Sequence, residues 1–127
     1  MFFAERVGDL TRRMLRKKLY VVLSEPLVAP DKLQPFLLAH LEYMIGLEKR
    51  GIVFASGPLS DSEAGGPPSG KGLTVLRAAS AEEARALAEA DPFFINGLRR
   101  FELKEWTLME GSLGLRVNLS DQTIEVA

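Results

Sequence analysis

The sequence contains no cysteine and only one histidine, His40, among its 127 residues. The absence of cysteine excludes disulfides, thiol nucleophiles, iron–sulfur clusters and cysteine-based zinc sites. With a single imidazole, a mononuclear metal site would need carboxylates or a second chain for its other ligands. We therefore expect neither a metal nor another cofactor.

Long apolar runs and a strong charge of one sign are also missing. No run approaches the roughly 20 residues that span a bilayer, and neither a secretory h-region nor an A-x-A cleavage site follows the start. The net charge is −1, which does not favour nucleic-acid binding. With 46% apolar and 26% charged residues, the composition is that of a soluble globular protein. We expect a cytoplasmic protein with no nucleic-acid and no membrane partner.

The first 18 residues are more basic than the rest of the chain. They carry six basic and two acidic side chains, and so short a run favours a solvated N-terminal helix over a segment that binds a membrane surface or RNA. Met14 would itself make a natural start. We expect one domain over residues 1–127, with an N-terminal extension at 1–13, a core at 14–109 and a C-terminal tail at 110–127.

The apolar pattern predicts strands and helices in the order β-α-β-β-α-β. The expected elements are a strand at 19–23, a helix at about 32–50, strands at 52–59 and 72–78, a helix from Ser80 to about Ala90, a short turn of helix from Asp91-Pro92 to Gly97, and a strand at 101–109. Capping boxes mark both helix starts, Asp31 with Gln34 and Ser80 with Glu83. This order predicts an α+β, ferredoxin-like fold, in which one antiparallel four-stranded sheet carries both helices on one face.

A ferredoxin-like sheet leaves its second face uncovered. A single chain would expose a large apolar patch there, so we expect a homodimer. Residues 113–126 predict two short strands that have no core of their own. We expect this tail to add to a sheet edge or to the partner subunit, where it could join dimers into a higher homo-oligomer.

One glycine-rich motif superficially indicates nucleotide binding. Residues 65–71 fit G-x-x-x-x-G-K, the start of a phosphate-binding loop. Gly72 follows, however, where a Ser or Thr is needed, and the next predicted element is a strand instead of a helix. We interpret residues 60–70 as a flexible connector that could act as a lid.

His40 and Asp91 are the residues best suited to chemistry. His40 lies on the sheet-facing side of its predicted helix, and imidazole transfers protons near neutral pH without help. It could also be a core-edge residue bonded to a backbone carbonyl. Asp91 precedes Pro92 and so fits a helix N-cap. Because the two helices share one face of the sheet, Asp91 could instead bond to the Nδ1–H of His40 and fix its tautomer.

Several features together resemble the YciI-like family. They are Leu19-Tyr-Val-Val-Leu23, His40-Leu41, Gly51, Ser56-Gly57-Pro58 and Ala88-Glu-Ala-Asp91-Pro92-Phe93. The resemblance covers residues 14–109 and implies a dimeric α+β barrel, in which two ferredoxin-like sheets pack face to face. It also implies a cleft in each subunit with a histidine–aspartate pair, here His40 and Asp91. One branch of the family removes HCl from a chlorinated hydroxyquinol during aromatic degradation.

These observations lead to the hypothesis of a cofactor-independent lyase or isomerase that moves a proton on a small activated ring compound. HCl elimination from a chlorinated hydroxyquinol is one such reaction. The expected site residues are His40 and Asp91 for proton transfer, with Ser56, Gly57, Phe93 and Phe94 for substrate binding, although the two phenylalanines also fit a core. The alternatives are a non-catalytic module that binds a small ligand and a structural oligomeric protein.

Overall fold

The computed structural model describes residues 2–127, which form two compact units. One unit is Lys18–Thr107, and the other combines the described residues up to Lys17 with Leu108–Ala127. The larger unit lies within residues 14–109, the range predicted for the core. No helix among residues 2–127 is both long enough and apolar enough to span a membrane.

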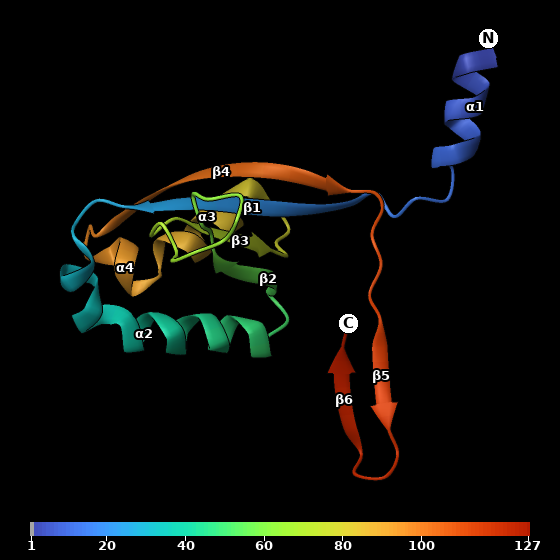
Figure 1. Cartoon of the computed structure of the whole chain (residues 1–127). Coiled ribbons are helices and arrows are strands. Elements are labelled where there is room, and N and C mark those ends of the chain that lie inside the picture. Colours follow the sequence, from blue (N-terminus) through green and yellow to red (C-terminus); the bar gives the residue numbers. More distant parts are fainter. Residues whose placement is uncertain (1) are drawn as a thin grey trace. The chain divides into compact units, whose positions relative to one another are not determined.

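The larger unit has the predicted element order, including the short helix after Asp91. Its elements are β1 Lys17–Pro26, α2 Pro30–Lys49, β2 Val53–Pro58, β3 Gly72–Leu76, α3 Ala81–Glu89, α4 Pro92–Ile95 and β4 Arg99–Leu108. The strands form one sheet in the order β2-β3-β1-β4, and β3 runs antiparallel to both of its neighbours. Helix α2 lies along one side of this sheet (Figure 1). The predicted α+β, ferredoxin-like fold is confirmed.

Helix α2 begins earlier than the sequence pattern indicated. Its N-cap is Ala29, which makes no side-chain cap bond, and Pro30 is its first residue. Proline suits that position because its fixed φ is helical and its missing N–H would have no partner there. Asp31 lies inside the first turn, where its negative charge interacts favourably with the positive end of the helix dipole. The predicted capping box at Asp31 is therefore wrong.

The second predicted cap is present. Ser80 Oγ accepts a hydrogen bond from the Glu83 N–H at 3.1 Å, and the Glu83 carboxylate accepts one from the Ala79 N–H at 2.7 Å. The first bond satisfies a backbone donor that the helix leaves unpaired, and the second pairs the N–H of the residue before the N-cap. The cap fixes where α3 begins and so helps to place Asp91, which follows this helix.

The core lies between the sheet and the helices. Its buried centre is Val22, Leu76 and Ala88, with Phe101 and Leu103 among the residues packed against it. Because side chains alternate along a strand, Val22 and Leu76 face this core. The residues next to Val22 in β1 and next to Leu76 in β3 face the opposite side of the sheet.

The opposite face of the sheet is less exposed than the ferredoxin-like order predicted. The pairs Val21–Val75 and Leu23–Leu73 lie on it. Val75 is buried, whereas Leu23 is 36% exposed. A single chain thus leaves only part of this face open to water.

The smaller unit consists of a helix and a hairpin. Helix α1 spans Phe2–Thr11, within the predicted N-terminal extension, and the hairpin strands are β5 Leu115–Asn118 and β6 Thr123–Val126. Within residues 2–127 these two strands pair only with each other, so the predicted addition of the tail to a sheet edge is not observed. The alternative, addition to a partner subunit, stays a prediction.

Candidate functional site

His40 and Asp91 lie 51 residues apart in the sequence and are hydrogen-bonded in the structure, with 2.7 Å between Nδ1 and Oδ2. His40 comes from the middle of α2, and Asp91 is the N-cap of α4. An ionised carboxylate can only accept, so the imidazole donates its Nδ1–H and Nε2 carries the lone pair. No side chain or backbone group of residues 2–127 hydrogen-bonds to Nε2. The contact expected between these two residues is present.

Asp91 fulfils both of the roles considered for it. Its Oδ1 accepts a hydrogen bond from the Phe93 N–H at 2.9 Å, which caps α4, while Oδ2 accepts from His40. Asp91 is 4% exposed, the one charged residue of 2–127 that is buried. A buried carboxylate needs such partners because desolvation penalises an unpaired charge. The cap therefore holds the carboxylate that orients the imidazole.

The two phenylalanines after Pro92 face different spaces. The His40 ring stacks on the Phe93 ring, with centroids 4.3 Å apart and planes inclined by 19°. Phe93 also borders an outer groove, whereas Phe94 lines an inner cavity and meets Phe101 edge-on at 5.1 Å. Phe93 thus restricts the rotation of the imidazole and forms part of the groove wall.

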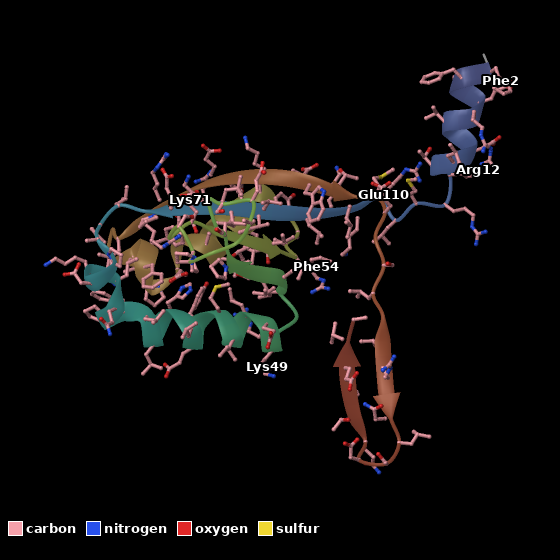
Figure 2. All side chains as sticks on the ribbon, in the orientation of Figure 1. Phe2, Arg12, Lys49, Phe54, Lys71 and Glu110 are labelled. Carbon is pink, nitrogen blue, oxygen red and sulfur yellow. The ribbon has the colours of Figure 1, made fainter. Side chains whose placement is uncertain are left out.

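His40 lies where the inner cavity and the outer groove meet. The cavity has about 40 Å³, room for only a few water molecules. The groove has about 790 Å³, a size typical of small-molecule sites. Five residues line both spaces: Ser24, His40, Met44, Thr74 and Arg99. The groove runs beside α2, and two of its lining residues, Phe54 and Lys71, are labelled in Figure 2.

The other two predicted residues, Ser56 and Gly57, also line the groove. Ser56 is directly opposite Thr74 in the β2–β3 ladder, and their hydroxyl oxygens are 2.7 Å apart. The structure therefore brings all six predicted residues to the same two spaces. Asp91 and Phe94 border the inner cavity, and His40, Phe93, Ser56 and Gly57 border the groove.

Arg99 belongs to the site and was missed by the sequence analysis. The last strand was predicted to begin at residue 101, whereas β4 begins at Arg99. Alternation then places Arg99 on the same face as Phe101 and Leu103. A basic residue on the apolar face of a strand is a signal that a longer predicted strand would have shown. Its Nη2 donates to Ser24 Oγ at 3.0 Å and to the Gly70 carbonyl at 2.6 Å.

Tyr43 was missed as well. It lies one turn after His40 on α2 and lines the inner cavity, and its hydroxyl donates to the Leu87 carbonyl at 2.6 Å. Burial raises the pKa of Tyr43, and the negative charge of Asp91 raises it further, against the opposing effect of Arg50. Tyr43 is therefore a neutral hydroxyl at physiological pH, and its proton is held by Leu87.

Charged side chains line both spaces: Asp91 lines the inner cavity, Glu48 and Lys71 line the groove, and Arg99 lines both. Burial lowers the pKa of Arg99, and the nearby Asp91 carboxylate opposes that shift. A guanidinium remains protonated in proteins, so Arg99 keeps its positive charge. No group of three potential metal ligands occurs among residues 2–127. The arrangement thus offers a base, an orienting carboxylate and a fixed positive charge, which can move a proton and hold a negative charge.

Comparison with known proteins supports the fold described above. The 5-chloro-2-hydroxyhydroquinone dehydrochlorinase of Burkholderia phenoliruptrix AC1100, solved in complex with 2,5-dihydroxybenzoquinone, is similar with a TM-score of 0.55 and 23% sequence identity. The similarity covers 70% of this chain and 93% of the dehydrochlorinase. No curated protein matches the chain. The YCII-related domain matches residues 18–107, the unit that carries the sheet, the cavity and the groove, and the chain therefore belongs to the YCII-related domain family.

Proposed function

We propose that this protein is a small lyase or isomerase in which His40 acts as general base on an activated ring compound bound in the groove. The observation that carries the proposal is the 2.7 Å contact between His40 Nδ1 and Asp91 Oδ2. This contact leaves Nε2 as the basic atom. The His40 side chain is 24% exposed, so a ligand can reach it.

HCl elimination from a chlorinated hydroxyquinol is the reaction we propose first, and the fold shared with the dehydrochlorinase supports it. In this reaction a hydroxyl proton moves to the ring carbon that carries chlorine, and loss of a second hydroxyl proton then expels chloride with the electrons of the C–Cl bond. His40 Nε2 would accept and return the protons. Asp91 would stabilise the imidazolium formed between these steps. No oxidant or reductant is consumed.

The groove supplies further groups for such a substrate. Phe93 would flank the ring in the groove, whereas Phe94 lines the inner cavity, which is too small for a ring. The Ser56 hydroxyl or the Gly57 amide would lie beside the leaving group. Ser56 is already bonded to Thr74, which would orient its hydroxyl. A positioned base typically contributes about 10²–10⁴-fold to a rate, and this is enough for an activated substrate.

The test is His40→Gln, which keeps a hydrogen-bonding side chain and removes the base. With 5-chloro-2-hydroxyhydroquinone as substrate and chloride release as the readout, we expect kcat to fall about 10²–10⁴-fold with a much smaller change in KM. Glu42→Gln is the matched control because Glu42 is an exposed residue of the same helix. Unchanged turnover in the His40 variant would refute proton transfer by this residue. Tight binding without any turnover in the wild type would favour a non-catalytic ligand-binding module.

We also propose that the chain self-associates through its tail. In the hairpin, Leu115 pairs with Val126 and Val117 with Ile124, and each of the four side chains is more than half exposed. A two-stranded hairpin is at best marginally stable alone in water. An apolar face on such a hairpin therefore favours contact with a second copy of the chain.

A further inference from the structure

We propose that Arg99 is the anion-binding residue of this site and that the groove takes a planar organic anion, held through its negatively charged oxygens. The inference rests on the proposed function in that it names the ligand class for the same groove. It does not require that His40 transfers a proton. Enolates, phenolates and carboxylates share the required chemistry, namely a planar group with charge on oxygen.

The guanidinium of Arg99 is anchored on one side and free on the other. Of its five N–H donors, the two on Nη2 bond to Ser24 Oγ and the Gly70 carbonyl. Within residues 2–127, Nη1 and Nε have no hydrogen-bond acceptor. None of the enclosed side-chain nitrogens of this part of the chain lacks a partner, so these donors are open to solvent. Anchoring at Nη2 thus leaves three N–H donors, on Nη1 and Nε, for a ligand.

Arg99 also lacks a carboxylate partner. In the part of the chain that the structure describes, no Asp or Glu oxygen lies within salt-bridge distance of it, whereas the next residue, Arg100, pairs with Glu25. The oxygens of Asp91 are already bonded to His40 and the Phe93 N–H. The two acceptors that Arg99 does bond, Ser24 Oγ and the Gly70 carbonyl, are neutral, so no group in direct contact balances its charge. An anionic ligand would supply the missing partner.

Arg99 lines the same spaces as His40. Both residues line the cavity and the groove, and both lie against Phe93, with the His40 ring centroid at 4.3 Å and Arg99 Cζ at 5.9 Å from its centroid. An anion on Arg99 would therefore lie in the same space as Nε2. Negative charge that develops on a ring oxygen during proton transfer would be stabilised there.

Gly72 leaves room for this arrangement. It is directly opposite Ser24 in the β1–β3 ladder. A Cβ at position 72 would lie 3.1 Å from Ser24 Oγ and 3.8 Å from Arg99 Nη2. The first distance is shorter than an ordinary contact, so a side chain here would press on the hydroxyl that anchors Arg99.

The test measures the binding of 2,5-dihydroxybenzoquinone to the full chain by isothermal titration calorimetry. This probe is a planar ring whose hydroxyls ionise in neutral water. We expect Arg99→Gln to weaken binding about 10–100-fold, the range for a hydrogen bond to a charged group. Arg99→Lys keeps the charge without the planar, fixed donors of the guanidinium and should weaken binding about 3–10-fold. Arg100→Gln, the matched control on the other face of β4, should bind like the wild type.

Several outcomes would overturn the proposal. They are no detectable binding to the wild type, a loss below about threefold in Arg99→Gln, and an equal loss in Arg100→Gln. If circular dichroism shows that Arg99→Gln is unfolded, Arg99→Lys and Gly72→Ala decide, and wild-type affinity in both would refute the assignment. His40→Gln separates the two proposals. If it retains turnover while Arg99→Gln loses binding, the base is wrong and the anion site stands.

Discussion

Replacing Asp91 by asparagine would separate the two roles of this carboxylate, because asparagine keeps one oxygen and substitutes an amide for the other. Oδ1 could still accept the Phe93 N–H, and asparagine caps helices as well as aspartate does. The amide would then donate to His40 Nδ1, which can accept only in the other tautomer. Nε2 would carry the proton and could no longer act as a base. We expect turnover to fall about 10²–10⁴-fold.

We expect Asp91→Asn to lower the free energy of unfolding only slightly, although it removes most of the turnover. Asp91→Asn replaces a charge-assisted hydrogen bond by a neutral one, a loss of about 1 kcal/mol in the free energy of unfolding. Asp91→Ala also loses the cap, worth about 1 kcal/mol, and leaves the Nδ1–H without its acceptor, so we expect a loss of about 2–4 kcal/mol. For a chain of this size, 1 kcal/mol corresponds to roughly 3–5 °C in Tm.

The tautomer can be observed directly because the sequence has a single histidine. In the chain labelled with ¹⁵N-histidine, long-range ¹H–¹⁵N spectra should show the Nδ1–H form in the wild type and the Nε2–H form in Asp91→Asn. The control is Asp31→Asn, because Asp31 is an exposed carboxylate in the first turn of α2, the helix that carries His40. This variant should show the Nδ1–H form, like the wild type. If the wild type already has the Nε2–H form, or if Asp91→Asn keeps Nδ1–H, the assignment of Nε2 as the base is refuted.

Three further predictions concern the rest of the chain. Leu76→Ala in the core, where Leu76 is 2% exposed, should cost about 2–5 kcal/mol in urea unfolding. Leu38→Ala at 69% exposure should change stability by less than about 0.5 kcal/mol, and similar losses in both would contradict the core described here. Hydrogen bonds from Thr123 lower the pKa of Asp121 below its ordinary 3.8. The folded hairpin is therefore favoured above that pH and weakens as pH falls through the lowered pKa. The Thr123 amide shift should follow this titration and lose it in Asp121→Asn. Deleting residues 113–127 should lower the assembly state on a sizing column while a folded dimer remains, and an unchanged elution size would exclude that role for the tail.

The order of elements could be predicted from the sequence alone because local patterns encode it. The apolar residues of α2 recur at helical spacing, and the Ser80–Glu83 cap needs only residues within one turn. Two boundaries differ from the prediction. Helix α2 begins at Pro30 instead of about residue 32, and β4 begins at Arg99 instead of Phe101. Because the predicted strand began at residue 101, the prediction missed Arg99, which lies on the core face once β4 begins at residue 99.

The site itself was decided by the tertiary structure. Nothing in the spacing of His40 and Asp91 sets a 2.7 Å contact between them. That contact depends on α2 and α4 lying over the same face of the sheet, a result of long-range packing. The sequence by itself determined which chemistry was available, because it supplies one imidazole and no thiol. Packing determined which carboxylate and which guanidinium share a groove with that imidazole, since side chains far apart in a chain meet only when the strands between them pair.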